Sequence, residues 1–250
     1  MASLRDRRGR PIVVVTGMGI ITSLGVSKKD NWDKLAEGES GIRRISRFAN
    51  EGLKTTIAGT VNSVTVEPFC SSELCERMAT MVAEEALAQA GIGADGDFPG
   101  PLFLAVAPVE IEWPHRDALA AASGANDKID YHDLLRAGAS GSFRAVHERC
   151  LFGSVGDHLA DRFGTKGAPI SVSTACASGA TAIQLGVEAI RRGDTDAALC
   201  IDYRAPVNLD GKRNIFIPNF KIPFIFYHEL RDPARQVVVR PIFYQYSFGR

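Results

Sequence analysis

The feature that most constrains the fold is an alternation of short apolar runs with longer helical segments. The runs are rich in β-branched and other apolar residues, and each has the length of a strand. They cover residues 11–18, 101–108, 169–174 and 196–202. Strands that alternate with helices are typical of βαβ units. The sequence therefore predicts an α/β fold with a mainly parallel or mixed sheet, and the first run reads as a strand buried on both faces.

Capping residues mark the ends of several expected helices. Ser27 precedes a short helical segment and Ser71 a longer one, as N-cap residues do. Gly91, Gly164 and Gly193 each follow a helical segment, where glycine commonly ends a helix. The stretch between the second and third apolar runs mixes helical and Gly/Ser-rich pieces, so its structure stays open.

Composition excludes several classes of function. The 250 residues carry 29 basic and 29 acidic side chains. A formal charge of zero argues against a nucleic-acid or anionic-membrane partner. No apolar run reaches the roughly 18 residues of a membrane span. The five cysteines are scattered, without a CxxC motif or paired Cys/His ligands, so we expect a reduced, cytoplasmic setting and no structural metal.

Two further motifs indicate a function only weakly. Gly17 and Gly19 form a GxG after the first strand, but Thr22 occupies the third glycine position of a dinucleotide fingerprint. A lone GxG is a weak signal, so nicotinamide binding is not predicted. Glu84 and Glu85 are adjacent in the long helix and do not face each other. We expect both to be exposed to solvent rather than to act as a catalytic pair.

Cys176 lies at a more specific position, where the strand "ISVST" turns into a helix beginning "ACASGATAIQLG". A helix N-terminus presents N–H groups and positive dipole charge, which stabilise a thiolate. The N–H groups of the turn would also suit an oxyanion, as in other nucleophile elbows. Gly179 and Gly186 point to close packing around this helix. Placement alone leaves two readings open, a nucleophile or a small buried core residue.

Three segments make the sequence similar to a known family: "VVVTGMGIITSLG", "WDKLAEGESGIRRISRF" and "GAPISVSTACASGATAIQLGVEAIRRGDTDAALC". They resemble the β-ketoacyl-acyl-carrier-protein synthases, type II condensing enzymes of the thiolase superfamily. The likeness covers about residues 11–201, and "TACASG" is its most specific element. It implies the N-terminal half of a thiolase-like layered fold.

The resemblance also implies a mechanism in which Cys176 is the catalytic residue. An acyl group moves from a carrier thioester to the cysteine, and malonyl-carrier protein then loses carbon dioxide and attacks it. Splitting the reaction in this way is covalent catalysis. The family needs no metal or organic cofactor, because the phosphopantetheine arm of acyl carrier protein delivers both substrates. Family members form homodimers, which implies "PISVSTA" at an interface.

The chain departs from the family in its second half, where members carry two catalytic histidines and a lysine. None of the five histidines has the required sequence context, and we expect surface or helix-packing roles for them. They are His115, His132, His147, His158 and His228. Glu110, Glu112 and Trp113 stand where relatives have a Gly-rich turn. One interpretation is that they line the acyl pocket or the dimer interface. The other is that they belong to a loop specific to a subfamily.

Residues 203–250 differ sharply in composition, with many aromatic residues and little alanine. Prolines interrupt their apolar segments, which suits edge strands or non-strands. We therefore predict a nucleophile-bearing ketosynthase domain over 11–202 and a divergent tail over 203–250. The function expected is a fatty-acid β-ketoacyl synthase that is truncated and impaired in condensation. The alternative is a non-catalytic half-fold that acts only as a partner subunit or remnant.

Overall fold

A computed structural model describes residues 5–46, 55–64, 71–93, 95–106, 113–124, 130–203 and 224–227. The elements are β1 (Val14–Met18), α1 (Lys28–Ala36), β2 (Ile42–Arg44), β3 (Ile57–Gly59), α2 (Ser71–Ala90), β4 (Leu102–Ala105), α3 (Trp113–Ala122), α4 (Tyr131–Ala139), α5 (Arg144–Cys150), α6 (Ser154–Phe163), β5 (Ile170–Val172), a 3₁₀ turn (Ala175–Ala177), α7 (Ser178–Arg192), β6 (Ala197–Asp202) and β7 (Phe224–Tyr227). The predicted α/β class is confirmed.

The main sheet has the strand order β1-β7-β6-β4-β5. Strand β4 pairs in parallel with both β5 and β6. Strand β7 runs antiparallel to both of its neighbours, β1 and β6. The sheet is therefore mixed, with a parallel part that carries the nucleophile strand. The described residues also form a small antiparallel pair of β2 and β3.

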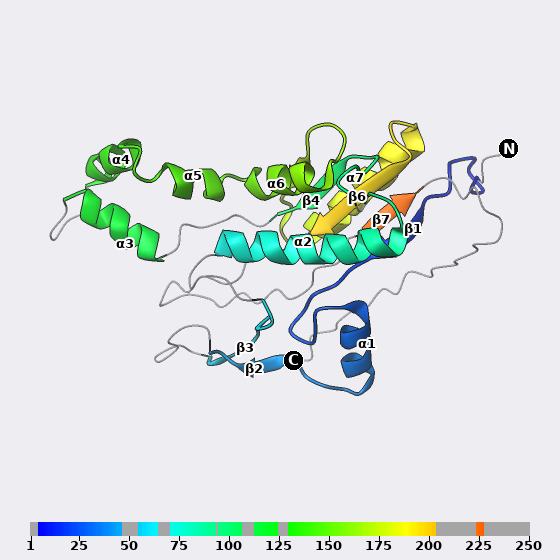
Figure 1. The fold of residues 1–250 in the computed structure, drawn as a ribbon, viewed down its shortest axis with the longest axis horizontal. Coiled ribbons are helices and arrows are strands. Elements are labelled where there is room, and N and C mark those ends of the chain that lie inside the picture. Colours follow the sequence, from blue (N-terminus) through cyan, green and yellow to red (C-terminus); the bar gives the residue numbers. More distant parts are fainter. Residues whose placement is uncertain are drawn as a thin grey trace.

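Helices cover both faces of this sheet (Figure 1). Side chains alternate between faces along a strand, so Leu102 and Leu104 of β4 join a core with α2 and α6. Phe103 and Ala105 point to the other face and join a core with α7. All four residues of β4 are buried, as a central strand requires. Helices α3, α4 and α5 extend away from the sheet (Figure 1).

Strand β1 differs from its prediction. The apolar run predicted burial on both faces, but only Gly17 in β1 is buried and the other residues are half-exposed. The reason is position, because among the described strands β1 is at the edge and pairs only with β7. An edge strand has a neighbouring strand on one side only.

The predicted tail contains a strand inside the sheet. Phe224–Tyr227 lies between β1 and β6, so the expectation of an edge strand is wrong for this segment. Pro223 precedes the first strand residue in the sequence, and a proline there removes no N–H from the ladder. The predicted boundary after residue 202 stays a prediction.

The two glycines of the GxG motif serve helix packing. A Cβ on Gly17 would lie 2.0 Å from the backbone oxygen of Ala86 in α2, and one on Gly19 would lie 2.1 Å from that of Val82. Only a residue without a side chain lets α2 approach the strand this closely. The segment that follows is a loop, and the next helix begins only at Lys28. The two glycines thus have a packing role that does not depend on a nucleotide.

Glu85 is half-buried, so the expectation of solvent exposure is wrong for this residue. Its carboxylate accepts hydrogen bonds from the backbone N–H groups of Ile20 and Lys28, both at 3.0 Å. It thus ties the loop after β1 and the start of α1 to α2. Glu84, by contrast, is exposed and pairs with Arg162 at the surface.

Replacing Glu85 by alanine removes both of these bonds and leaves two backbone donors with reduced access to water. We expect the Glu85→Ala variant to lose about 2 kcal/mol of unfolding free energy, because hydrogen bonds to charged groups contribute more than neutral ones. The matched Glu84→Ala variant is expected to change it by less than about 0.5 kcal/mol. Urea denaturation measures both. Equal losses in the two variants would contradict the anchoring role of Glu85.

Candidate functional site

Cys176 lies in the 3₁₀ turn that joins β5 to α7, and it is exposed. The sequence placed it in the first turn of the helix itself, whereas α7 begins two residues later at Ser178. The thiol therefore stands at the N-terminal end of a 15-residue helix.

The turn contains a strained residue immediately before the cysteine. Ala175 has φ of +51°, and it is the one described residue other than glycine with a positive φ. This region costs a residue with a Cβ about 1 kcal/mol or more. Strain of this kind occurs at sharp turns that project a nucleophile from between a strand and a helix. Sequence reasoning missed it, because alanine gives no signal for a left-handed conformation.

Ser178 holds the strained turn in place. It is only 5% exposed. Its hydroxyl accepts a hydrogen bond from the Thr174 N–H at 2.8 Å and donates one to the Ala175 carbonyl at 2.8 Å. Both ends of the turn are thus fixed by a single side chain. The sequence pointed to Ser178 only as a small residue; a hydroxyl at a helix start is the signal that could have identified this role.

Backbone bonds inside the turn limit which N–H groups are available to a ligand. The Ala177 N–H donates to the Thr174 carbonyl at 3.1 Å, and the Ser178 N–H donates to the Ala175 carbonyl. The N–H of Thr174 is bound to Ser178, as described above. These three donors are occupied, so the expected oxyanion role does not fall to them.

The helix behind the thiol packs closely on the sheet, as its small residues predict. A Cβ on Gly179 would lie 2.6 Å from a carboxylate oxygen of Asp202, and one on Gly186 would lie 2.5 Å from Cys200 Sγ. The Cys200 thiol donates to the Ala182 carbonyl, and burial raises its pKa. Cys200 is therefore the packing cysteine of this region, in contrast to exposed Cys176.

The described histidines do not gather into a second catalytic group. His115, His132, His147 and His158 are exposed and lie on four successive helices, α3 to α6. His158 Nε2 is 3.1 Å from a carboxylate oxygen of Glu76, consistent with the surface role predicted for it. His228, Glu110 and Glu112 lie outside the described residues, as does the side chain of Trp113. The described residues contain no cluster of three or more side chains able to hold a metal ion.

Losing the Ser178 hydroxyl removes the side-chain acceptor of the Thr174 N–H and one of the two donors to the Ala175 carbonyl. We expect Ser178→Ala to lower the free energy of unfolding by about 1–3 kcal/mol. Thr181, one helical turn further on, bonds the Ala177 carbonyl from a more exposed position. Thr181→Ala is therefore expected to cost less than about 0.5 kcal/mol. Urea denaturation compares the two, and an equal cost would show that Ser178 does not hold the turn.

Cys176 is thus an exposed thiol on a strained strand–turn–helix of a mixed sheet. The family profile described as "Beta-ketoacyl synthase, N-terminal domain" matches residues 10–201. The chain belongs to this family, as its sequence motifs predicted. None of the helices in the described ranges combines the length and apolar character of a membrane span.

Curated relatives come from two branches of the family. A chloroplastic 3-oxoacyl-[acyl-carrier-protein] synthase II of Arabidopsis thaliana is 29% identical over 80% of this chain and 37% of its own length. A putative polyketide beta-ketoacyl synthase 1 of Streptomyces cyaneus is 26% identical over 78% of this chain and 47% of its own length. The chain thus spans less than half of either relative.

Solved structures confirm the fold class. A chain in the solved complex of a type II polyketide acyl-carrier protein with its ketosynthase is similar to this one. The match covers 88% of this chain and 58% of that chain, with a TM-score of 0.65 and 21% identity. The ishigamide ketosynthase/chain length factor matches 87% of this chain and 58% of its own, with a TM-score of 0.60 and 22% identity. The prediction of a thiolase-like layered fold is confirmed.

Proposed function

We propose that this chain is the nucleophile-bearing half of a β-ketoacyl-acyl-carrier-protein synthase, and that Cys176 accepts the acyl group. The observation that carries the proposal is the exposed Cys176 thiol on a strained turn at the N-terminus of α7. Membership of the family supports the reaction type. The partner is acyl carrier protein, whose phosphopantetheine arm brings the substrate, and the reaction uses no resident metal or organic cofactor.

The first half-reaction is thiol–thioester exchange. The Cys176 sulfur attacks the thioester carbon and forms a new carbon–sulfur bond. The tetrahedral intermediate collapses as the carbon–sulfur bond to the carrier breaks, and the proton lost by Cys176 ends on the departing carrier thiol. Ser178 keeps the turn in the geometry that exposes the Cys176 thiol.

The second half-reaction is condensation with a malonyl thioester. Loss of carbon dioxide leaves a carbanion, which attacks the acyl–Cys176 carbonyl. The carbon–sulfur bond to Cys176 then breaks, which frees the cysteine thiolate and releases a 3-oxoacyl thioester two carbons longer. Members of the family use two histidines and a lysine of their second half for this step. The described histidines are exposed on α3 to α6, so acyl transfer is the step proposed for these 250 residues, with condensation impaired unless those groups are supplied.

The pathway proposed is fatty-acid synthesis, in a cytoplasmic homodimer with β5 near the interface. The synthase relatives from Arabidopsis thaliana and Vibrio harveyi support it, and the scattered cysteines support the compartment. Polyketide synthesis is a second candidate, favoured by the Streptomyces relatives. A non-catalytic half-fold that serves only as a partner subunit is the alternative from another class.

Intact mass spectrometry after incubation with a medium-chain acyl-carrier-protein thioester tests the proposal. We expect a mass increase of one acyl group, located by peptide mapping to the segment that contains Cys176. A polyketide role would show as faster acylation by a 3-oxoacyl thioester than by a saturated one. If a folded sample gains no mass with either substrate, the proposed acyl transfer is contradicted and the non-catalytic alternative is favoured.

A further inference from the structure

An exposed turn near the N-terminus has a fixed shape. Asp6 stands at its centre, and one of its carboxylate oxygens accepts the backbone N–H groups of Arg8 and Arg10 at 2.8 and 2.9 Å. The Arg5 guanidinium donates to the Gly9 carbonyl at 2.6 Å. The backbone N–H and guanidinium of Arg10, with the N–H of Arg8, lower the pKa of Asp6 to about 2. Asp6 is therefore ionised at physiological pH, and the turn is preorganised.

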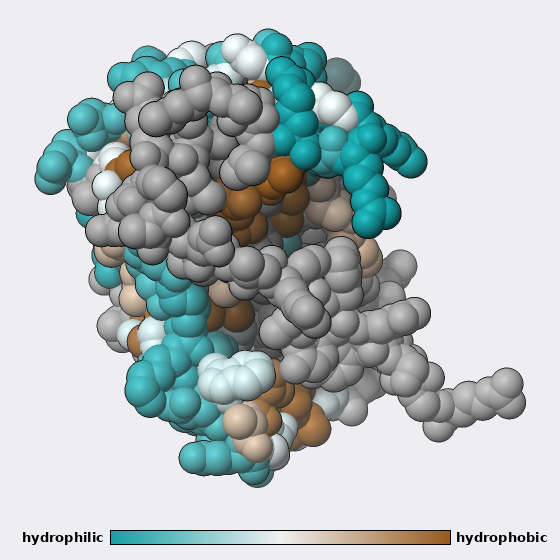
Figure 2. All heavy atoms as spheres, turned by 90° about the vertical axis from the view of Figure 1, so that its right-hand side faces the viewer, coloured by the Kyte–Doolittle hydropathy of each residue, from teal (hydrophilic) through white to brown (hydrophobic). Residues whose placement is uncertain are grey.

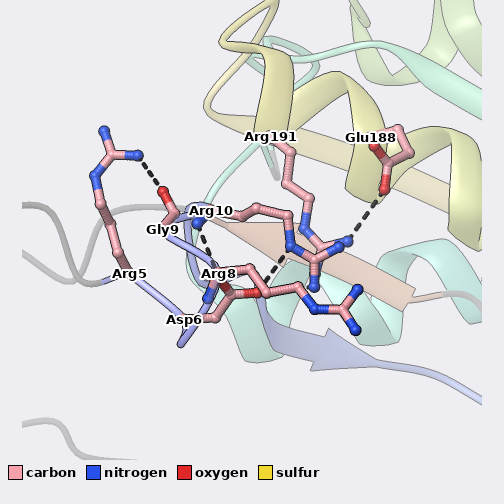
Figure 3. Close-up of polar contacts among 7 residues, drawn as sticks. All are labelled: Arg5, Asp6, Arg8, Gly9, Arg10, Glu188 and Arg191. Atoms are coloured by element: carbon pink, nitrogen blue, oxygen red, sulfur yellow. Dashed lines mark hydrogen bonds and ion pairs between the residues drawn. The ribbon is translucent and has the colours of Figure 1, made fainter.

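The turn lies beside the end of α7. Val13, just after the turn, packs on a core that includes Ala189 and Ile190, the residues before Arg191. Figures 1 and 3 agree on this placement, and Figure 3 shows the guanidinium groups of Arg8, Arg10 and Arg191 gathered on one side. Figure 2 looks onto this end of the molecule, and hydrophilic side chains line its upper part.

Positive charge exceeds negative charge in this cluster. Arg10 pairs with Asp6 at 2.8 Å, and Arg191 pairs with Glu188 at 3.1 Å. The Arg8 side chain has no hydrogen bond or ion pair with the described residues. Three guanidinium groups thus face two carboxylates, and one positive charge is left over. In addition, the Nε of Arg191 is buried without a hydrogen-bond partner in the described part of the chain.

The helix dipole accounts for only part of this arrangement. Arginines in the last turn of a helix complement its negative end, which explains Arg191 and Arg192, and Arg192 also pairs with Asp194. It does not explain Arg8, which comes from a separate segment. Gathering like charges costs energy unless an anion lies among them. The Arg10 and Arg191 side chains are 46% and 25% exposed, so an ion in solution can reach them.

We propose that Arg8, Arg10 and Arg191 form a binding site for a phosphoryl group. Guanidinium forks donate pairs of parallel hydrogen bonds to oxyanions. A phosphoryl group has enough oxygens to accept from three guanidinium groups together, whereas a carboxylate has two. The site belongs to the C-terminal end of α7, and Cys176 precedes the opposite end of that helix. It is thus separate from the acyl-transfer site and does not depend on the proposed function.

Isothermal titration calorimetry of the full chain with inorganic phosphate at low ionic strength tests the site. We expect saturable binding of one phosphate per chain, weakened at least tenfold in the Arg8→Gln variant. Arg7→Gln is the matched control, because Arg7 lies in the same turn, is exposed and changes the charge equally. We expect it to weaken binding less than twofold. The Arg8 side chain makes no hydrogen bond or ion pair with the described residues, so unchanged thermal unfolding is expected to verify that its variant is folded.

Titrations with further ligands identify the chemical group that binds and the kind of molecule that supplies it. Acetate is expected to bind at least tenfold more weakly than phosphate, and equal binding would overturn the phosphoryl assignment. Equal weakening of phosphate binding in Arg8→Gln and Arg7→Gln would contradict the proposed site. The absence of saturable phosphate binding would do the same. Tighter binding of glycerol phosphate than of inorganic phosphate would support a phosphate ester as the ligand. The reverse order would support the free ion.

Discussion

The Cys176→Ala variant is expected to lose acylation by at least about a thousandfold, because removing a nucleophile leaves no atom to form the covalent intermediate. Two of the other described thiols are poorly placed to replace it. Cys75 and Cys200 are buried, and burial raises the pKa of Cys200, which keeps its thiol protonated. A buried, protonated thiol is a poor nucleophile. Among the described thiols this leaves half-exposed Cys150 as the competing acceptor.

Cys150→Ala provides the matched control for this experiment. Cys150 is half-exposed at the end of α5, far along the chain from the turn, and the same substitution removes the same thiol. We expect its rate of acylation to stay within about twofold of the wild type. An acyl group retained in Cys176→Ala but lost in Cys150→Ala would move the nucleophile to another element and refute the assignment.

Local sequence signals predicted the elements around the site well. Ser27 caps α1, and its hydroxyl accepts the Asp30 N–H at 3.1 Å, as the capping pattern indicated. Gly164 and Gly193 end α6 and α7 with φ of +60° and +80°. These features depend on neighbouring residues alone, so a single sequence contains what is needed to predict them. The position of Cys176 between a strand and a helix follows from the same signals.

Features that depend on distant residues could not be predicted in this way. The place of Phe224–Tyr227 between β1 and β6 results from pairing across the chain, and proline-rich surroundings pointed to an edge. Glu85 was expected at the surface, because nothing near it in the sequence shows that Ile20 and Lys28 need an acceptor there. The strain at Ala175 is set by the Ser178 hydroxyl and the close fit of α7 on the sheet. Such contacts become visible only once the elements are assembled.

The Gly17→Ala variant is expected to lose about 3 kcal/mol of unfolding free energy, the upper end of what overpacking usually costs. Its new methyl group would lie 2.0 Å from the Ala86 backbone oxygen, and backbone in the middle of α2 cannot turn aside as a side chain does. Strand and helix would have to separate, which would expose part of the core that α2 shares with β4 and β6. Urea denaturation measures the change.

Gly138→Ala is the matched control, since it adds the same methyl group inside helix α4. A Cβ there meets nothing within 4 Å, so alanine is expected to stabilise the fold by about 0.5–1 kcal/mol through its better helix propensity. Opposite signs for the two variants would show that Gly17 in β1 is required for close packing of α2. A loss below about 1 kcal/mol in Gly17→Ala would mean that α2 does not press on β1 as described, because a 2.0 Å approach to backbone cannot be relieved so cheaply.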